Sequence, residues 1–434
     1  MVRPPRAQIQ PIGLDLGLDS IKMLQLEVRE SIPTRAGTPG ILSLAVVAAA
    51  KAPLPEAARK NPEKRAVLAA ETLRRMFAQQ PFVGRRVVAA LPREIVHVKN
   101  MRLPLLPPDQ LEEAARLEAP SVYPFDISQA TLQFLPAGQV RQGSETRQEV
   151  IVLAAMNNEV DDYLEQLNQL GVKVESLDTE ITGLFRAFER FTRRRDDLDT
   201  VQMLVDIGAR QTQVMIAKGR DISFYKPVHL GGLHLLDAVS RKLGITIDEA
   251  KALRQRLLES GDDRRDPVRQ AVFDATRKVA EELGRELAMC LRYYSVTFRG
   301  RGPVRLRIAG GEASDPQLHA IFKSILSIPV EGAQPLYSVD TSAMRSVDRK
   351  GRMSQWALAM GLSLRNVPHY FAPKDGIPRV ALEIEPAGQS PQIEAPVAIK
   401  EAPVVAEEAM PALPEAIEAA ADATPTAPRE EIHA

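Results

Sequence analysis

The sequence predicts a two-lobed α/β fold in which each half of the chain begins with a strand that ends in the same kind of turn. One turn lies in IGLDLGLDSIK at 12–22 and the other in LVDIGARQTQV at 204–214. Each stretch has an apolar strand, an aspartate, a glycine two residues later and a hydroxyl near the start of the next strand. A third observation is the pair Gly310-Gly311, which directly follows another apolar strand. Two similar halves of this kind suit one site that is shared between them.

Composition narrows the function classes. At 434 residues the chain is long enough for two or three domains, and its apolar share of 44% is that of an ordinary globular protein. Its single cysteine, Cys290, excludes an intramolecular disulfide and fits a reducing compartment. The first residues lack the apolar core of a signal peptide, and the apolar run at 41–50 has about half the length of a membrane span. We therefore expect a soluble, cytoplasmic protein that reaches a membrane only through a partner.

Charge is unevenly distributed, although the formal net charge is zero. Residues 381–434 hold eleven acidic and two basic side chains and no aromatic one, so the body before them is basic. The basic clusters at 193–195 and 299–301 are typical of solvated helix faces, because no aromatic residues are interleaved with them. We therefore predict no binding to nucleic acid.

The first lobe is expected to comprise residues 1–92 and 171–198. Its predicted elements are strands within 12–50, a helix over 55–79, a strand at 85–92 and a helix at 178–192. Between its two parts, residues 93–170 predict an inserted module of strand, helix, two strands and helix. Its first helix opens at Asp109, a plausible N-cap, and its last helix ends at Gly171, a natural C-cap.

The second lobe is expected over 199–367, where strands again alternate with amphipathic helices. Its predicted helices include IDEAKALRQRLLE at 247–259 and a long one at about 267–296, which contains Cys290. After this lobe the composition shifts to Ala, Pro and Glu. Such a segment cannot bury enough apolar surface to offset its chain entropy, so 368–434 is predicted to be a disordered, acidic tail.

The paired turns have the chemistry that a magnesium nucleotide needs. Phosphates are bound by backbone N–H groups of tight turns that glycine allows to approach, and a carboxylate at a strand end can hold hydrated Mg²⁺. The residues that fit are Asp15, Gly17 and Ser20 in the first half, and Asp206, Gly208 and Thr212 in the second. In each turn taken alone, ordinary hairpin chemistry is the alternative. Together they predict opposing hairpins that bind the phosphates, with Asp15 and Asp206 holding Mg²⁺ through water.

In this order and spacing, Asp15-Leu16-Gly17, Asp206-Ile207-Gly208 and Ala309-Gly310-Gly311 resemble the two phosphate motifs and the adenosine motif of the actin, Hsp70 and sugar-kinase superfamily. Within it the chain resembles the PilM family of type IV pilus assembly, relatives of the division protein FtsA, over about residues 10–366. The further stretches that carry this resemblance are MRLP at 101–104, EAPSVYPFDI at 118–127, IVLAAMNNEVDDYLEQLNQLGVKVESLD at 151–178, VHLGGLHLLDAV at 228–239, IDEAKALR at 247–254 and ALAMGLSLR at 357–365.

The resemblance implies an actin-like fold in which 93–170 matches the 1C subdomain of FtsA and PilM, the flanking first lobe is 1A, and the second lobe is 2A/2B. It also implies a cytoplasmic, ATP-binding scaffold, peripheral to the inner membrane, that binds the cytoplasmic tail of a PilN-like protein in a groove near 1A and 1C. Homo-oligomers are compatible with it. The expected partner contacts are Leu103, Tyr123 and Phe125, although from sequence alone the two aromatics are more typical of a core. The expected nucleotide contacts are Asp15, Gly17, Ser20, Lys22, Asp206, Gly208, Thr212, Gly231, Gly232, Glu249, Arg254, Gly310 and Gly311.

Several residues differ from the family's usual pattern and keep alternatives open, among them Arg210 and Gln211 in the second loop, where smaller residues are common. Leu18 and Asp19 stand where small or hydroxyl residues are usual, Lys251 replaces a glutamate, and Glu312 replaces a glycine. One alternative is an interaction scaffold whose nucleotide site has degenerated. Another is an FtsA-like division protein, which the acidic tail disfavours, and a metabolic kinase is disfavoured by the inserted module.

Hydrolysis needs a side chain that orients the attacking water. The candidates are Asp206 and Gln211, with Asp178 as a third, and the sequence does not choose among them. We therefore expect at most a slow, magnesium-dependent ATPase.

Overall fold

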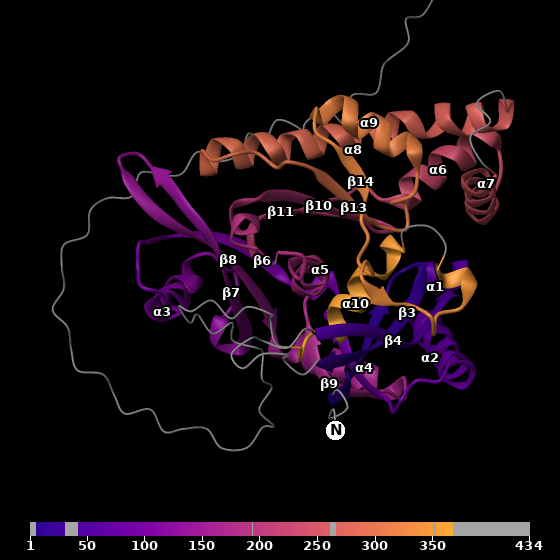
Figure 1. The fold of residues 1–434 in the computed structure, drawn as a ribbon, viewed down its shortest axis with the longest axis horizontal. Coiled ribbons are helices and arrows are strands. Elements are labelled where there is room, and N and C mark those ends of the chain that lie inside the picture. Colours follow the sequence, from indigo (N-terminus) through magenta and orange to yellow (C-terminus); the bar gives the residue numbers. More distant parts are fainter. Residues whose placement is uncertain (1–5, 31–41, 193, 261–265, 350–352, 368–434) are drawn as a thin grey trace, which may run out of the picture. The chain divides into compact units, whose positions relative to one another are not determined.

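The structure is a computed structural model, which describes residues 6–30, 42–192, 194–260, 266–349 and 353–367 (Figure 1). The chain divides into two units, Met1–Ile384 and Glu385–Ala434. The second unit and the whole predicted tail at 368–434 lie outside the described residues.

The first sheet contains seven strands in the order β15-β4-β3-β2-β5-β9, and β1 pairs with β3. The strands are β1 (Arg6–Ile9), β2 (Ile12–Leu16), β3 (Ser20–Glu30), β4 (Leu42–Pro53), β5 (Arg86–Ala90), β9 (Lys173–Asp178) and β15 (Val339–Asp340). β2 is antiparallel to β3 and parallel to β5, which is in turn parallel to β9. The carboxyl ends of β2, β5 and β9 therefore meet at one edge of the sheet, where ligands of α/β proteins usually bind.

Helices pack against this sheet from several parts of the chain. They are α1 (Glu56–Lys60), α2 (Pro62–Gln79), α4 (Asn157–Gln169) and α10 (Ala357–Ser363), and α5 (Glu180–Glu189) packs on α10. α2 and α4 share one hydrophobic cluster with the sheet, in which Leu73 and Leu167 contact β2 residues such as Leu14. α10 packs on β3 and β4 through Ala359 and Met360, so the chain returns to the first sheet at its described end.

The helix predicted over 55–79 is broken into α1 and α2. Asn61 has extended backbone angles, and its side-chain oxygen accepts a hydrogen bond of 3.0 Å from the backbone N–H of Lys64. Pro62 follows at the first position of α2, where its missing N–H costs nothing. Asn61 and Pro62 together therefore end one helix and start the next.

The inserted region contains a three-stranded sheet in the order β6-β8-β7. Its elements are β6 (His97–Pro104), α3 (Pro108–Glu118), β7 (Ala130–Gln142) and β8 (Glu145–Met156). Leu111 and Ala115 of α3 pack on this sheet in a cluster of its own, whereas Tyr163 of α4 belongs to the cluster of the first sheet. The packing therefore favours an end of the inserted unit after β8, while the boundary at residue 170 stays a prediction.

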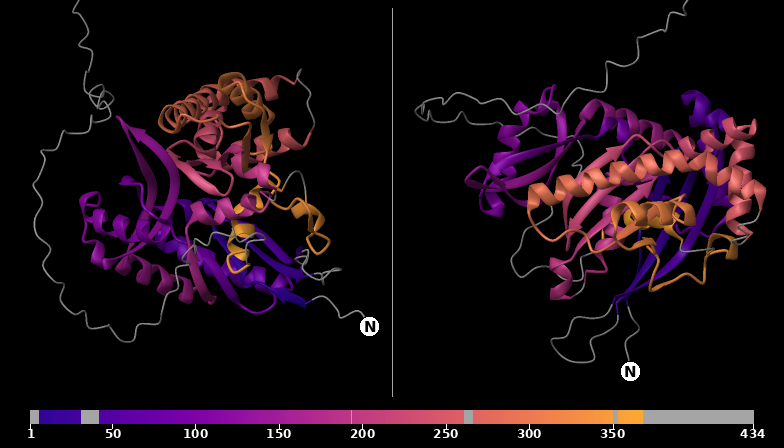
Figure 2. Two further views of the ribbon diagram at one scale, coloured as in Figure 1. Left: turned by 60° about the vertical axis from the view of Figure 1, so that its left-hand side comes forward. Right: turned by 90° about the horizontal axis from the view of Figure 1, so that it is seen from above.

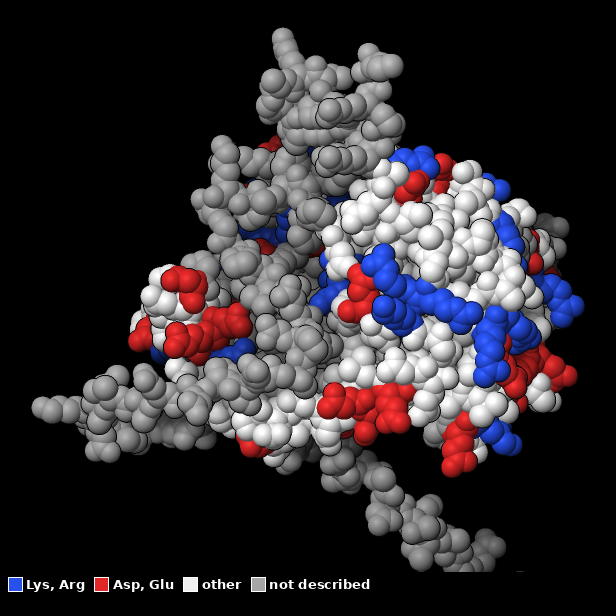
Figure 3. All heavy atoms as spheres, turned by 90° about the horizontal axis from the view of Figure 1, so that it is seen from below, with Lys and Arg blue, Asp and Glu red and all other residues white. Residues whose placement is uncertain are grey.

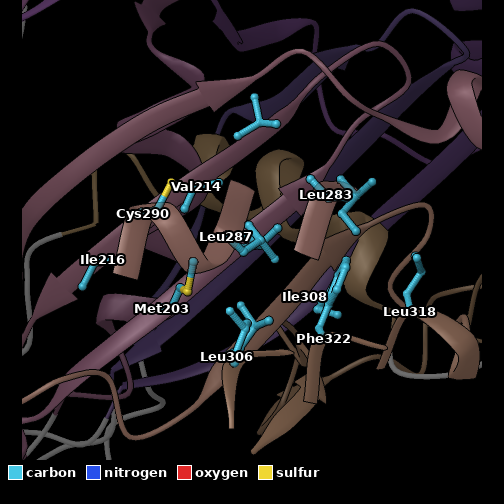
Figure 4. Packing of buried hydrophobic residues seen from close by; sticks show 14 of the residues in the cluster. Met203, Val214, Ile216, Leu283, Leu287, Cys290, Leu306, Ile308, Leu318 and Phe322 are labelled. Atoms are coloured by element: carbon cyan, nitrogen blue, oxygen red, sulfur yellow. The ribbon is translucent and has the colours of Figure 1, made fainter. Parts of the chain in front are cut away.

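The second sheet contains five strands in the order β12-β11-β10-β13-β14. They are β10 (Val201–Ile207), β11 (Thr212–Lys218), β12 (Asp221–Val228), β13 (Leu306–Gly310) and β14 (Val330–Gly332), and the helices are α6 (Gly232–Leu243), α7 (Ile247–Glu259), α8 (Pro267–Phe298) and α9 (Pro316–Leu326). The long helix α8 crosses one face of this sheet (Figure 2). Leu287 and Cys290 of α8 and Phe322 of α9 pack on Met203 and Ile308 of the strands (Figure 4).

α5 packs against the inserted sheet and the second sheet in one core. Leu184 and Phe188 of this helix lie in one hydrophobic cluster with Leu204 and Met215 of the second sheet.

Within the described residues, no helix is long and apolar enough to cross a membrane. On the face seen in Figure 3, basic and acidic side chains gather in separate neighbouring patches.

Candidate functional site

The two Asp-Gly turns are hairpins with the same register. In each, the aspartate faces the residue seven positions later, and a loop of four residues, 17–20 or 208–211, joins the strands. The facing pairs are Asp15 with Lys22 and Leu16 with Ile21 in the first hairpin, and Asp206 with Gln213 and Ile207 with Thr212 in the second. The backbone of one hairpin is therefore repeated in the other, residue by residue.

This register changes which residues correspond. Gln211 occupies the place of Ser20, and Thr212 occupies the place of Ile21. Thr212 is fully buried, and its hydroxyl donates a 2.7 Å hydrogen bond to the carbonyl of Leu230. The hydroxyl of Thr212 thus stabilises the second lobe, and Gln211 is the side chain at the loop position that Ser20 holds in the first hairpin.

Both loops need glycine because of close backbone contacts. A Cβ atom on Gly17 would lie 2.9 Å from the carbonyl oxygen of Ser20 and 3.4 Å from Asp15 Oδ1. A Cβ atom on Gly208 would lie 2.9 Å from the carbonyl oxygen of Gln211. The aspartates and the loop backbones are consequently held together more closely than any side chain at these positions would allow.

Arg65 of α2 holds the first loop by its carbonyl groups. Its guanidinium donates hydrogen bonds to the carbonyl oxygens of Leu16 at 3.0 Å, Gly17 at 2.9 Å and Leu18 at 3.2 Å. In a trans peptide the N–H of the next residue points opposite to the carbonyl. The amides of residues 17–19 therefore point away from Arg65 as successive donors, which is the arrangement of an anion-binding nest.

In the second loop a helix terminus has the role of Arg65. The carbonyl oxygens of Gly208 and Ala209 accept hydrogen bonds of 2.9 and 2.8 Å from the amides of Gly232 and Leu233, at the start of α6. By the same peptide geometry, the amides of residues 209 and 210 point away from α6. Gly231 also lies against this loop, because a Cβ atom there would be 2.6 Å from the carbonyl oxygen of Gly208.

Three carboxylates and two cations meet between the hairpins. Lys22 Nζ lies 2.6 Å from Asp15 Oδ2, and Arg93 contacts both Glu180, by a hydrogen bond, and Asp206, at 3.9 Å. Gln213 also donates to Glu180, at 2.5 Å. With three acidic and two basic groups, the cluster has one negative charge in excess when all five are ionised.

The cluster shifts the proton affinities of its members. Burial raises the pKa of Glu180 to about 7, against the opposing effect of Arg93, and the charges of Asp15 and Asp206 raise it further. Burial also raises the pKa of Asp206, although Arg93 and Lys22 oppose it. Burial alone would lower the pKa of Lys22, but Asp15 and the other two carboxylates raise it above its ordinary value. Excess negative charge on oxygen donors suits a hydrated divalent cation, so the residues present fit Mg²⁺ bound through water.

A site in which three or more side chains ligate a metal directly was not found among the described residues. Among them, no three His, Cys, Asp or Glu side chains are grouped so that they could hold an ion.

Asp19, at the tip of the first loop, joins the two halves of the molecule. Its carboxylate contacts Arg59 at 2.8 Å and Lys251 of α7 at 2.5 Å, and Arg59 also contacts Asp248 of α7 at 2.6 Å. We call these four residues the Asp19 clasp. The unusual Asp19 and the unusual Lys251 are therefore direct partners, so each charge neutralises the other.

The adenosine-side candidates lie near the glycine pair. Arg254 is buried and donates 2.8 Å hydrogen bonds to Glu312 and Asp315, which neutralises the unusual Glu312. A Cβ atom on Gly232 would lie 2.7 Å from Glu312 Oε1, so this ion pair adjoins the start of α6. Glu249 instead caps α7, where it accepts 2.8 Å hydrogen bonds from the backbone N–H and the hydroxyl of Thr246.

Gly310 brings the glycine pair to the second loop. It has a φ of +88°, and a Cβ atom there would lie 2.8 Å from Asp206 Oδ1 and 2.4 Å from the carbonyl oxygen of Ile207. Only glycine suits both the conformation and the contact. The glycine pair, the second loop and the start of α6 therefore converge.

Of the residues expected to bind a partner, two lie in the core of the inserted sheet. Leu103 and Tyr123 are 4% and 5% exposed, and the Tyr123 hydroxyl donates a 2.9 Å hydrogen bond to the carbonyl of Val152. Phe125 is half-buried and contacts the rings of Tyr123 and His97.

A crevice lies between the inserted sheet and the first lobe, and Leu103, Tyr123 and Phe125 are not among the residues that line it. It is lined almost entirely by apolar atoms, and its lining includes Leu91, Val96, Leu153 and Val160. Gln133 also lines it, and the buried side-chain oxygen of this residue has no hydrogen-bond partner.

Sequence reasoning missed Arg65, Arg93, Glu180 and Gln213. Two of them were within reach of a simple rule: Arg93 follows β5 and Glu180 follows β9, and both strands run parallel to β2. Side chains just after parallel strands gather at one sheet edge, so both belong beside Asp15. Asp178, the third candidate for water activation, is instead buried and bound by Arg186 at 2.7 Å and Arg365 at 3.1 Å.

The two hairpins have equal register, and each turns at the end of interior strands of its own sheet. They define a two-lobed α/β protein of the actin-like ATPase fold, as the sequence predicted. The family model of the type IV pilus assembly protein PilM matches residues 13–367, and the chain belongs to this family. Whether the inserted sheet is of the FtsA type stays a prediction.

One solved structure shows the same fold. The chain is similar to a protein of the PilM–PilN type IV pilus biogenesis complex, with a TM-score of 0.63 and 22% identity over 83% of this chain and 99% of that one. Weaker likenesses include the ethanolamine utilization protein EutJ of Carboxydothermus hydrogenoformans, with a TM-score of 0.44 and 14% identity over 84% and 92% of the two chains. MreB 5 of Spiroplasma citri bound to AMPPNP has a TM-score of 0.40 and 12% identity over 83% and 96%.

Proposed function

We propose that this protein is a cytoplasmic, nucleotide-binding scaffold of type IV pilus assembly. It binds ATP with Mg²⁺ between its two halves and docks to the cytoplasmic tail of a PilN-like protein of the inner membrane. The observation that supports the nucleotide site most strongly is the pair of equal hairpins, each with its carbonyls tied back and its amides free to face an anion. Membership of the PilM family supports the role in pilus assembly.

The residues present have complementary roles toward the nucleotide. The amides of the two glycine loops, at 17–19 and 209–210, would contact the phosphates, with Ser20 and Lys22 beside them. Asp15 and Asp206 would hold Mg²⁺ through water, and the bound ion would supply neutralisation of phosphate charge. Gly231, Gly232, Gly310 and Gly311 would form the wall for the nucleoside, braced by Glu249 and Arg254, while Thr212 would support the second loop from behind.

Glu180 is the side chain best suited to exchange a proton with water in this site. Its pKa of about 7 allows it to hold or release a proton near neutral pH. It lies in one cluster with Asp206, and Gln211 stands in the adjoining loop. Its contacts with Arg93 and Gln213 leave little of the carboxylate free, so any hydrolysis would be slow.

The Asp19 clasp gives a route by which nucleotide and partner would influence each other. It ties the first phosphate loop to α7 by charged contacts, so a ligand that moves the loop changes the contact between the halves. A partner that prefers one arrangement of the halves would then change the affinity for nucleotide by the same factor.

The crevice beside the inserted sheet is the best-supported place for the partner's tail. The similar solved protein is part of a PilM–PilN type IV pilus biogenesis complex. Apolar side chains of an extended peptide would fill the crevice, and a peptide N–H would satisfy the unpartnered oxygen of Gln133. The expected partner contacts Leu103, Tyr123 and Phe125 do not line this crevice, so they would be additional contacts of the tail.

Two titrations test this proposal. A fluorescent ATP analogue with Mg²⁺ should bind the full chain, and binding should weaken in Asp206→Asn. A fluorescent peptide with the cytoplasmic sequence of the host's PilN-like protein should bind with an affinity that Gln133→Leu reduces and the exposed control Gln129→Leu does not.

A second candidate function is a scaffold without nucleotide. The observation that favours it is that two of the unusual charges, Asp19 and Glu312, are already neutralised within the protein. If the ATP analogue does not bind at millimolar concentration while the peptide does, this second function is correct.

A further inference from the structure

A second pocket lies at the outer edge of β4, on the first sheet. It has a volume of about 200 Å³ and is lined by residues 50–53 of β4, one face of the end of α2, and Arg345 of the segment before η5 (Ser346–Arg349). This volume has room for several water-sized groups. β15 pairs with β4 only at Leu44 and Ala45, so within the described residues no strand covers the edge of β4 at the pocket.

The charged groups that line the pocket are all cations. Lys51, Arg75 and Arg345 come from three different elements, and the other polar lining residues are Thr72, Gln79 and Gln80. Residues so far apart in the sequence converge here only because α2 and the segment near 345 both pack against β4.

Most of this positive charge is not neutralised. Lys51 donates to the neutral oxygen of Gln355, and Arg75 donates to the hydroxyl of Thr72 at 3.3 Å. In the described part of the chain neither contacts a carboxylate, and only Arg345 is ion-paired, through its Nε to Asp348 at 2.8 Å. Burial lowers the pKa of Lys51, as do the nearby charges of Lys22 and Lys251, while Asp19 and Asp348 oppose this.

The pocket is separate from the nucleotide site, although the same strands connect them. Asp15, Lys22 and Lys51 face one another in register across β2, β3 and β4. Neighbouring strands are about 4.8 Å apart, so Lys51 lies roughly 10 Å from Asp15 along the sheet. Arg75 and Arg345 have no part in the carboxylate cluster described above.

We propose that this pocket binds a phosphate group, either as free phosphate or as the phosphate of a small ester. Arginine provides paired donors that match phosphate oxygens, lysine adds a point charge, and the amides and hydroxyl of the lining complete the polar contacts. The site is additional to the nucleotide cleft and does not depend on whether that cleft binds ATP.

Calorimetric titration of the full chain with inorganic phosphate and, separately, with glycerol 3-phosphate tests the proposal. Arg75→Gln and Arg345→Gln should each weaken binding about tenfold, because each removes charged hydrogen bonds. Arg74→Gln is the matched control, since Arg74 is adjacent to Arg75 on α2 and is exposed like it, but does not line the pocket. The ratio of the two affinities shows whether free phosphate or an ester is preferred.

Hydrogen exchange locates the binding. Phosphate should protect the backbone at 50–53 and 72–80 in the wild type and also in Asp206→Asn, which separates this site from the nucleotide cleft. The proposal is overturned if neither probe binds, if Arg75→Gln and Arg345→Gln bind as tightly as Arg74→Gln, or if protection appears only at 15–22 and 206–213.

Discussion

The two hairpins have one backbone and two different means of support. The first loop is held by side chains from other elements, chiefly Arg65, Arg59 and Lys251. The second loop is held by backbone amides at the start of α6. Both arrangements point the loop amides in the direction where an anion would be bound. Anion binding by such a loop therefore requires a particular orientation of the peptides, and different groups can hold that orientation.

The two aspartates also differ in the groups that neutralise them. Asp15 has Lys22 as a direct partner on the facing strand, whereas Asp206 faces the neutral Gln213 and has its nearest cation, Arg93, at 3.9 Å. One aspartate is thus neutralised within its own hairpin, and the other is neutralised only loosely from another segment. The first hairpin should therefore be sensitive to single side-chain changes that the second tolerates.

The largest effect is expected for Arg65→Ala. It removes three hydrogen bonds from a charged donor, so the first loop loses its orientation and nucleotide binding should weaken by about 2–3 kcal/mol, or roughly 30- to 150-fold. Titration with a fluorescent ATP analogue measures this change. Arg74→Ala, on the same helix, is the control and should bind like the wild type. Equal affinity of the two variants would show that the first loop needs no side-chain support.

Asp15→Asn and Asp206→Asn should have unequal effects on stability. Asp15→Asn leaves the largely buried Lys22 without its carboxylate, so it should lower the free energy of unfolding by about 2 kcal/mol. Asp206→Asn removes a carboxylate whose burial already raises its pKa, so its effect should be close to zero or slightly stabilising. Thermal and urea unfolding measure both, with the exposed Asp274→Asn as control. Equal losses for the two variants would contradict the difference between the hairpins.

Glu180 lies between the two hairpins and should make stability depend on pH. Its pKa rises from 4.5 to about 7 on folding, so between these values the folded protein holds a proton that the unfolded chain has released. The contribution of this group to stability is therefore present at low pH and is lost as the pH rises toward 7. Glu180→Gln should remove that decline, which unfolding curves at pH 5, 6 and 7 would show. An unchanged slope in the variant would mean that Glu180 is ionised throughout.

Much of this architecture could be predicted from the sequence, because short local patterns of residues determine it. The strand, aspartate and glycine order identified both hairpins, and the order of the motifs identified the family. The equivalence of Gln211 with Ser20 could not be predicted, since the position of a hydroxyl does not reveal the length of the loop before it. Helix 55–79 was predicted without its break, although the dipeptide Asn61-Pro62 is a signal of a turn that the sequence contains.

Contacts between distant segments were beyond sequence reasoning for another reason. Asp19 and Lys251 are 232 positions apart, and each taken alone looked like an unfavourable departure from the family pattern. Only the fold places them together and converts two apparent defects into one ion pair. The role of Arg65 could not be predicted, because it binds backbone carbonyl groups and every residue has one.

The smallest effect, and the sharpest test of how the first loop is supported, concerns the Asp19 clasp. Asp19 and Lys251 are each about one-third exposed, so solvent screens their attraction, and their coupling should be about 0.5–1 kcal/mol. A double-mutant cycle with Asp19→Asn, Lys251→Gln and the combined variant isolates this energy from thermal unfolding. The coupling should shrink when salt is raised from 0.05 to about 1 M, because the Debye length falls. The pair Lys60 and Glu56, within α1 alone, is the matched control, and the same cycle there reports an ion pair that does not cross between the halves. If the Asp19 cycle gives no coupling while Asp19→Asn strengthens nucleotide binding, the carboxylate of Asp19 repels the phosphates directly, and the clasp does not hold the first loop.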